Sequence, residues 1–180
     1  MAAIYGGKEL AAAFRTVRKN TIQVAEDIPA EKYSFVAAPE VRSVARMLTH
    51  AAIATRIWQI MNKPGLTTLV GFNFSNLMDE FNAEEAKPRA KSEILDLLKT
   101  EGEKFAAWLE MATPEFLAET VTEPDGKTTK TRLERLLSAK EHEMHHRGQL
   151  MLIERQLGIV PHLTRQFQER VAQMRAAAKA

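Results

Sequence analysis

Apolar residues recur at alternating intervals of three and four positions in four long segments of this 180-residue chain. This spacing places them on one face of an α-helix and is close to the pattern by which antiparallel helices pack in bundles. The alternating pattern of a β-strand is nearly absent. The sequence therefore predicts an all-α protein, a four-helix bundle. The four stripes are Leu10, Phe14, Val17, Thr21, Val24, Ile28; Met47, His50, Ala54, Ile57, Met61; Ile94, Leu98, Gly102, Phe105, Leu109, Ala112; and Ala139, His142, His146, Gln149, Ile153, Leu157.

Residues at the ends of these segments favour the same helices. Pro29 ends the first helix, because proline lacks the amide hydrogen that the helix ladder needs. Ser92 is a candidate N-cap of the third helix, and Thr131 with Glu134 has the form of a capping box for the fourth. Gly158 has the position of a glycine that ends the fourth helix.

Shorter elements and one long connection complete the expected architecture. The composition predicts a turn over 123–127, a one-turn helix beginning at Thr113, and a short extra C-terminal helix over Leu163–Met174. The connection between helices 2 and 3, residues 62–91, is longer than most loops in bundles, and its middle, 75–85, has the pattern of a helix. We interpret it as a crossing that covers the end of the bundle, with a lid over a ligand site as the alternative. One domain is expected over residues 1–180.

The composition excludes several kinds of site and partner. The chain has no cysteine, which excludes disulfides, thiolate metal ligands, iron–sulfur clusters and a cysteine nucleophile. With 25 Lys and Arg against 23 Asp and Glu, the formal net charge of +2 predicts neither nucleic acid nor a membrane as a partner. Charged residues follow closely on the N-terminus, and no apolar run is long enough for a signal peptide or a membrane span. We therefore expect a cytoplasmic location.

Three histidines occupy positions where a bundle core usually has leucine. His50 lies on the second stripe, and His142 and His146 lie on the fourth. Residues four apart on a helix differ by about 40° and about 6 Å, so His142 and His146 stack on one face. An unpaired imidazole nitrogen in a core costs about 1–3 kcal/mol, and a divalent metal could satisfy one nitrogen of each ring. The spacing thus indicates metal ligands, with histidines hydrogen-bonded to backbone or water as the alternative.

Neighbouring polar residues are expected outside the set of ligands. His145 points about 100° away from His146, which suits a role behind the ligands, at an interface or on the surface. His162 follows the helix end and is predicted on the surface or in a loop. Glu141 and Glu143 lie off the stripe, and we interpret both as solvated groups or as supports of the ligands.

A family resemblance rests on three segments. The sequence HEMHHRGQL over 142–150 resembles the H-x-x-x-H-R-G-Q signature of the DinB-like (DinB/YfiT-like) family of metal-binding helical bundles. Residues 41–50 are similar to the family's second helix, and 157–161 to its exit from the fourth. The resemblance implies an up-down-down-up bundle, a homodimer, and a divalent ion, nickel or zinc, with iron or manganese as alternatives. By the same resemblance, the metal ligands are His50, His142 and His146.

Two functions from different classes follow. Three imidazoles without a carboxylate or thiolate leave coordination positions free, as in catalytic sites. Characterised relatives in the family that the chain resembles are transferases and isomerases that use glutathione, mycothiol or bacillithiol. This implies a small-molecule substrate and a low-molecular-weight thiol that brings the nucleophile; metal-assisted hydrolysis is a variant. The alternative is a non-catalytic, stress-related bundle protein that binds a metal or a small molecule.

Four side chains are candidates for the wall of a ligand pocket. They are Trp58, Phe72, Phe74 and Gln149. For the three aromatic residues, a place in the core is the simpler interpretation. Gln149 lies one turn beyond His146, and its amide on the stripe needs hydrogen-bond partners.

Overall fold

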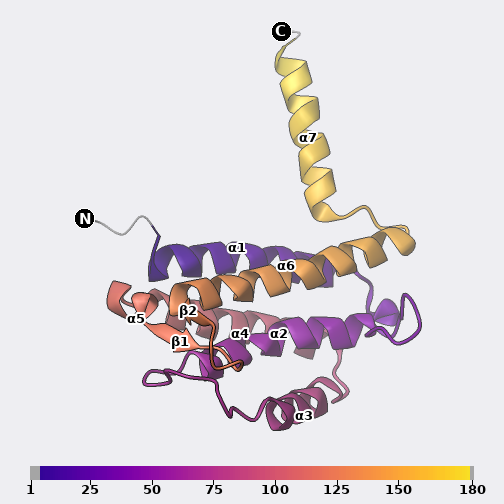
Figure 1. Ribbon diagram of the computed structural model, residues 1–180. Helices are drawn as coiled ribbons and strands as arrows, with labels where there is room; N and C mark the ends of the chain where they lie inside the picture. The colour runs from indigo at the N-terminus through magenta and orange to yellow at the C-terminus, as the bar shows by residue number, and fades with distance from the viewer. Residues whose placement is uncertain (1–4, 179–180) are drawn as a thin grey trace.

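The computed structural model describes residues 5–178. Its four long helices are α1 (Gly7–Asp27), α2 (Val44–Met61), α4 (Lys91–Glu110) and α6 (Arg132–Gln156). Helices α1 and α2 each pack against both α4 and α6, so the four helices form a ring around one core (Figure 1). The predicted all-α four-helix bundle is confirmed. Within the described residues, no helix combines the length and the apolar character needed to cross a membrane.

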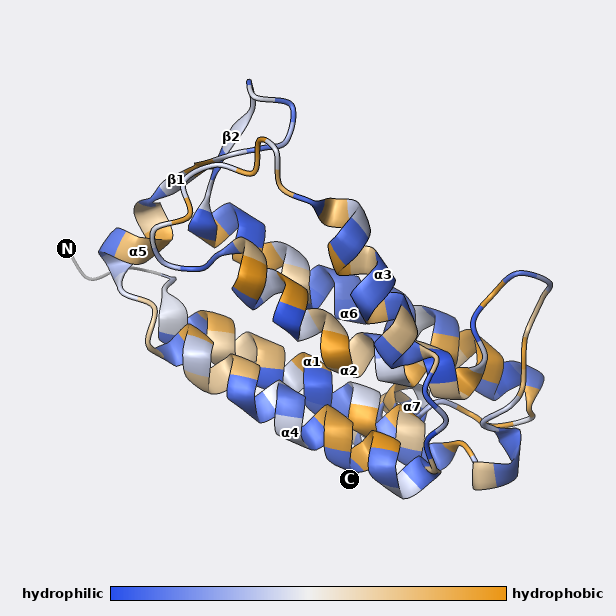
Figure 2. Ribbon diagram, turned by 90° about the horizontal axis from the view of Figure 1, so that it is seen from below, coloured by the Kyte–Doolittle hydropathy of each residue, from blue (hydrophilic) through white to orange (hydrophobic). Residues whose placement is uncertain are grey.

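The direction of each helix follows from which ends meet in the core. One apolar cluster joins the ends of α1 and α6 to the beginnings of α2 and α4. A second cluster joins the beginnings of α1 and α6 to the ends of α2 and α4. Helices α1 and α6 therefore run one way and α2 and α4 the other, which is the predicted up-down-down-up order. Figure 2 shows how hydrophobic and hydrophilic residues alternate around each helix, as such packing requires.

Because α2 and α4 are parallel, the chain has to travel back along the bundle between them. The connection does so with helix α3 (Phe74–Glu85), which lies on the outer side of α2 (Figure 1). The predicted helix over 75–85 is thus present. Before α3, the amide of Leu69 donates to the carbonyl of Thr122 at 2.8 Å, which fixes the first part of the connection to a hairpin that precedes α6.

That hairpin was not predicted. Strand β1 (Thr120–Thr122) pairs antiparallel with β2 (Thr129–Thr131), and the predicted turn over 123–127 is its loop. Gly126 in the loop has a φ of 69°, which glycine adopts without strain. Strands of three residues are too short to show a recognisable alternation, so the pattern missed them. Before the hairpin lies the expected one-turn helix, α5 (Pro114–Ala118), capped by Thr113.

The ends of the long helices contain one wrong prediction. The Thr131–Glu134 capping box is present, and Gly158 after α6 has a φ of 79°. Ser92, however, is not the N-cap of α4, because the helix already begins at Lys91. The carboxylate of Glu93 accepts from the amide of Ala90 at 2.6 Å and so takes the capping role.

The last helix, α7 (His162–Ala177), is longer than the predicted 163–174 and projects away from the bundle (Figure 1). Its first residue corrects another prediction, since His162 is only 3% exposed. Pro161 is the N-cap of the helix, and Nε2 of the buried His162 lies 3.2 Å from Oδ1 of Asn20 on α1. His162 is therefore a buried contact between helices and not a surface residue.

Candidate metal site

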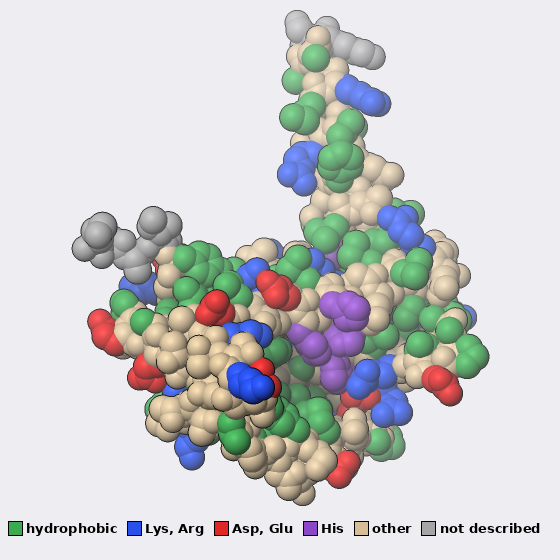
Figure 3. Space-filling view, viewed as in Figure 1, with side chains coloured by type: hydrophobic (Ala, Val, Ile, Leu, Met, Phe, Trp, Pro, Cys, Tyr) green, Lys and Arg blue, Asp and Glu red, His purple; other side chains and the backbone are tan. Residues whose placement is uncertain are grey.

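The structure brings His50, His142 and His146 together between α2 and α6. His50 lies in the second turn of α2, and the other two lie on consecutive turns of α6. The Nε2 atoms of His50 and His142 are 3.1 Å apart, and those of His142 and His146 are 3.2 Å apart. One ligand atom from each residue lies within 4.8 Å of the others, a spacing at which one metal ion could be held. Figure 3 shows the histidines gathered on one face of the bundle, with basic side chains beside them.

The outer ring nitrogens indicate where the protons are. His50 Nδ1 lies 2.9 Å from Oε2 of Glu85, and His146 Nδ1 lies 2.9 Å from Oε1 of Gln149. Both partners are acceptors, so both Nδ1 atoms carry the proton, and both Nε2 atoms present a lone pair toward His142. Nε2 of His142 carries at most one proton, so it can donate a hydrogen bond to Nε2 of His50 or of His146, but not to both. A cation between the rings would satisfy all three nitrogens, so the donor set fits a divalent metal.

Burial keeps two of these rings neutral. It lowers the pKa of His142 to about 3 and that of His146 to about 4, and the neighbouring imidazoles act in the same direction. For His146, the hydrogen bond to Gln149 opposes part of this effect. Neutral imidazole is the form that binds metals. Near pH 7, protons therefore do not compete for these two rings.

Glu85, at the end of α3, is a functional residue that the sequence analysis missed. It is 2% exposed, accepts hydrogen bonds from His50 and from Arg42 Nε at 2.8 Å, and forms an ion pair with Arg46, whose Nη2 lies 3.2 Å away. Burial pushes the pKa of Glu85 upward, but the hydrogen bonds from His50 and Arg42 outweigh it and hold the pKa at about 2. Glu85 is thus an ionised carboxylate that orients His50. No spacing rule indicated it; the only signal was an acidic residue ending the predicted helix.

Gln149 and His145 lie behind His146. Nε2 of Gln149 lies 3.2 Å from Nε2 of His145, while its Oε1 accepts from His146. His145 is exposed and contributes no nitrogen to the group that converges. This agrees with the expectation that His145 lies outside the ligand set and acts behind it.

Glu143 is not solvated, and it does not contact the histidines. Its carboxylate accepts two hydrogen bonds from Arg18, at 2.8 and 2.9 Å, and both side chains are buried. Arg18 also donates to the carbonyls of Leu98 and Ala51, so the pair joins all four long helices. Residues beyond the single apolar stripe of α6 are also buried, so the prediction that Glu143 is solvated or supports the ligands was wrong. Glu141, by contrast, is exposed as expected.

A pocket of about 390 Å³ opens beside His146. Much of its wall is apolar, from the loop before α2 and from α2 and α6, and Glu40, Arg42, His145 and Gln149 add polar groups. The side chains that form the apolar part are Ala37, Val41, Met47, Leu152 and Ile153.

Of the four predicted wall residues, only Gln149 lines this pocket. Phe72 and Phe74 pack against each other, with ring centroids 4.7 Å apart, and Trp58 is half-buried with its ring 6.4 Å from that of His142. No residue of the connection over 62–91 lines the pocket. The connection therefore contributes Glu85 behind a histidine and does not form a lid.

A sequence model of the DinB family matches residues 3–176. The chain belongs to the DinB family. The uncharacterized protein YjoA of Bacillus subtilis (strain 168) is 26% identical over 154 residues, which is 83% of this chain and 90% of YjoA. The crystal structure of YjoA, a DinB-like protein, matches with a TM-score of 0.62 and 24% identity, over 83% of this chain and 92% of that one.

A second structure supports the topology of this DinB protein. YfiT from Bacillus subtilis matches with a TM-score of 0.67 and 16% identity, over 88% of this chain and 93% of that one. YfiT is described as "a probable metal-dependent hydrolase with an unusual four-helix bundle topology". At this identity the likeness establishes the shared fold. The family resemblance of the sequence is confirmed by the match of the family model over residues 3–176.

Proposed function

We propose that this DinB protein is a metal-dependent enzyme that uses a low-molecular-weight thiol to transfer or isomerise a small molecule. His50, His142 and His146 hold the divalent ion. The observation that carries this proposal is the convergence of their three Nε2 atoms, with Glu85 and Gln149 behind two of the rings. Imidazole ligands suit nickel, zinc and iron. We expect nickel or zinc, as the family resemblance implies.

Three neutral ligands leave a divalent ion its full charge and free coordination positions, where it favours the ionised form of a water or thiol. The rest of the chemistry depends on the chain itself. The pocket opens beside His146, and its apolar wall excludes water from a bound small molecule. Arg42, His145 and Gln149 are placed in it to hold polar groups of that molecule.

The state of the nearby carboxylates favours a thiol over water as the nucleophile. Glu85 is held by His50 and Arg42, and Glu143 is held by Arg18, so neither is free to act as a base. The other carboxylate at the pocket, that of Glu40, is exposed on the loop before α2. A water molecule usually needs such a base, whereas a thiol with an ordinary pKa of about 8.5 ionises with little help. Because the chain has no cysteine, the thiol has to come from a cofactor.

The proposed location follows from the same chemistry. Glutathione and related systems keep the cytosol reduced, so such thiols are available there. We therefore propose a cytoplasmic location. Because YfiT is described as a probable hydrolase, hydrolysis is the competing reaction.

Metal content tests the first part of the proposal. Wild type and alanine variants of His50, His142, His146 and His145 are loaded with zinc or nickel, desalted and subjected to elemental analysis. We expect one ion per chain in wild type and in His145→Ala, and loss of the ion in the other three variants. Loss in His145→Ala with retention in His146→Ala would contradict the assignment.

Thermal shift tests the second part. Glutathione, mycothiol and bacillithiol are each added to the metal-loaded and the metal-free protein. Because a ligand stabilises the form that binds it, we expect the melting temperature to rise only in the loaded protein. A metal-dependent melting temperature without any thiol response would overturn the thiol proposal and support a non-catalytic metal binder. Ester hydrolysis by the loaded protein without thiol would support a hydrolase.

A further inference from the structure

A second cavity, of about 460 Å³, reaches Glu85, the carboxylate that holds His50. It shares no lining residue with the pocket beside His146, so it is a separate cavity. Its wall comes from the segment after α1, the beginning of α2, and the chain from the end of α3 to the beginning of α4. A volume of this size is within the range of small-molecule sites.

The wall of this cavity contains a buried hydroxyl without a partner. Thr49 lines the cavity and is only 2% exposed, and its hydroxyl makes no hydrogen bond to any residue in 5–178. Two other buried threonines differ, because Thr21 and Thr55 each donate to a carbonyl of their own helix at 3.2 Å. Buried polar groups in proteins usually have a partner. The hydroxyl of Thr49 is therefore available to a molecule in the cavity.

Arg46 adds unused donors to the same wall. A guanidinium carries five N–H donors, and the one polar contact of this guanidinium among the described residues is an ion pair with Glu85, where Nη2 lies 3.2 Å from Oε1. Arg46 is three residues before Thr49 on α2, so the two side chains share one face of the helix. A guanidinium beside a hydroxyl provides the donors that bind the oxygens of a phosphate or a carboxylate.

The other charged groups at the cavity already have partners or are exposed. Lys87 and Arg89 line it, but both are paired with Glu84, which is outside the wall. Glu31 is an exposed carboxylate. The anionic group of a ligand therefore belongs at Arg46, where donors remain.

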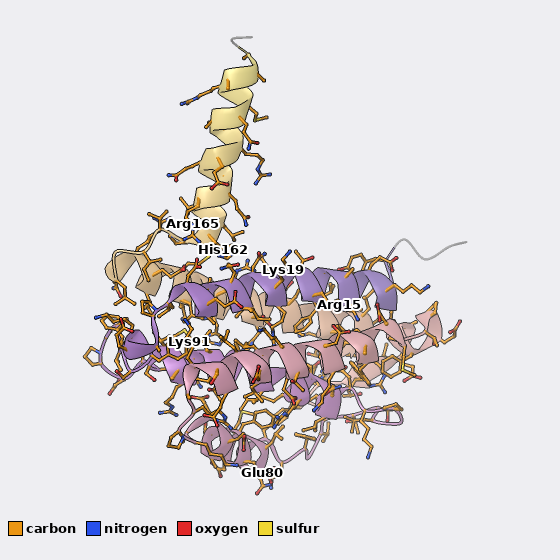
Figure 4. All side chains as sticks on the ribbon, turned by 180° about the vertical axis from the view of Figure 1, so that it is seen from behind. Arg15, Lys19, Glu80, Lys91, His162 and Arg165 are labelled. Atoms are coloured by element: carbon orange, nitrogen blue, oxygen red, sulfur yellow. The ribbon has the colours of Figure 1, made fainter. Side chains whose placement is uncertain are left out.

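Contacts behind Tyr33 fix another side of the cavity. Its hydroxyl donates to the carbonyl of Ala25 at 2.7 Å. Nζ of Lys91 lies 5.6 Å from the centre of its ring and donates to the carbonyls of Glu26 and Ile28, each at 2.7 Å. Figure 4 shows Lys91 at the beginning of α4, next to the end of α1. Tyr33 is thus held against α1, so this side of the cavity is preformed.

We propose that this cavity binds a small molecule through a phosphate or carboxylate group, held by Arg46 and Thr49, and that its occupancy strengthens the interaction of Glu85 with His50. Arg46 and His50 contact the two oxygens of one carboxylate: Nη2 of Arg46 lies 3.2 Å from Oε1 of Glu85, and Nδ1 of His50 lies 2.9 Å from Oε2. An anion at Arg46 neutralises a cation that Glu85 shares, so more of the negative charge of Glu85 acts on His50.

An effect on metal affinity follows, and this part rests on the metal site proposed above. A more negative partner makes an imidazole a stronger ligand, and the anion itself attracts a divalent ion. Both effects have the same sign, so a bound anion should tighten metal binding. By thermodynamic linkage, the metal should tighten anion binding by the same factor.

Calorimetric titration of the metal-free protein tests anion binding without any contribution from a metal. The probes are inorganic phosphate, glycerol 3-phosphate and succinate, which separate phosphate from carboxylate recognition. Arg46→Gln and Thr49→Val alter the cavity. Arg42→Gln is the matched control, because Arg42 also contacts Glu85 but lines only the pocket beside His146. Circular dichroism confirms that each variant is folded.

We expect at least one probe to bind to wild type and to Arg42→Gln. The dissociation constant should rise about tenfold or more in Arg46→Gln, which loses charged hydrogen bonds, and about two- to tenfold in Thr49→Val, which loses a neutral one. Failure of all three probes to bind wild type would overturn the proposal. Binding that is lost in Arg42→Gln and kept in Arg46→Gln would also overturn it, because it would place the anion beside His146.

NMR of the histidine rings tests the link to His50, again on metal-free protein. The probe that binds most tightly should shift the ring signals of His50 in wild type and leave them unchanged in Arg46→Gln; unchanged signals in saturated wild type would overturn the link. Competition with a chromophoric chelator then measures zinc affinity with and without this probe. We expect zinc to bind several-fold more tightly with the probe in wild type, with no such change in Arg46→Gln. A protein that binds the probe but no zinc would refute the proposed metal site and leave the anion site supported.

Discussion

Glutamine in place of Glu154 should make the protein more stable above pH 7. Glu154 lies near the end of α6 with no exposed surface, and neither carboxylate oxygen has a hydrogen-bond partner among the described residues. Burial raises the pKa of this carboxyl to about 7, and the charge of Asp27 adds to the effect, while Arg165 and Arg155 oppose it. The neutral acid is therefore the stable form, and ionisation costs free energy in the folded state.

The size of the effect follows from the two pKa values. The ordinary value of 4.5 and the folded value of about 7 differ by about 2.5 units, which corresponds to about 3 kcal/mol. Between these values the folded state binds more protons than the unfolded state. The free energy of unfolding therefore falls as the pH rises from about 4.5 to about 7, and the loss stays constant above that range. Glutamine does not ionise, so this loss is absent in Glu154→Gln.

Urea denaturation at pH 5 and pH 8, followed by circular dichroism, measures the difference. Groups other than Glu154 titrate alike in wild type and variant, so they cancel when the two pH dependences are subtracted. We expect Glu154→Gln to gain up to about 3 kcal/mol relative to wild type between pH 5 and pH 8. Glu141→Gln, an exposed change on the same helix, should follow wild type. Parallel pH dependences for Glu154→Gln and wild type would show that the buried carboxyl ionises without cost, which would refute the reasoning.

Three further predictions concern other parts of the molecule. Glu85→Gln removes the charge behind His50 and should weaken metal affinity about 10- to 100-fold, as measured by competition with a chromophoric chelator. Glu84→Gln is the control, because the carboxylate of Glu84 does not contact the histidines. Equal losses of affinity in both variants would contradict this role of Glu85. Glu143→Gln leaves Arg18 buried without a counter-charge and should lower the free energy of unfolding, measured by urea denaturation, by about 3–5 kcal/mol. A decrease below about 1 kcal/mol, which is typical of a surface ion pair, would argue against a buried pair. Gly7→Ala places a Cβ atom 2.4 Å from the carbonyl oxygen of Leu109 and should lower stability by about 1–3 kcal/mol in thermal melts. Gly148→Ala, where the added Cβ atom meets nothing within 4 Å, should not, and an unchanged stability of Gly7→Ala would contradict the contact.

The fold could be predicted because its determinants are local. Each long helix shows its own apolar stripe, and caps such as Thr131 with Glu134 depend on residues three positions apart. The same holds for His142 and His146, which share a face through their spacing alone. That His50 meets them depends on the height at which α2 packs on α6, which no local pattern contains. The family resemblance supplied this information, as it supplied the up-down-down-up order.

The missed features share one physical cause. Glu143 and Glu85 are buried charges whose partners lie on other helices; Arg18, for example, is 125 positions before Glu143. A charged residue in a sequence is expected at the surface unless its partner is known, and that partner is fixed only by the register of the packed helices. His162 was misplaced for the same reason, since Asn20 lies 142 positions away.

The order of the helices explains why a carboxylate can stand behind His50. In a bundle whose neighbouring helices alternate in direction, short loops would join α2 to the next helix, and no segment would pass the beginning of α2 again. Here α2 and α4 are parallel, so the chain returns along the outside of α2 and reaches the beginning of α4 beside the second turn of α2. Glu85 ends α3 at this point, six residues before α4, and it accepts from His50. The long connection is thus the consequence of the topology and the means by which one histidine of the site is oriented.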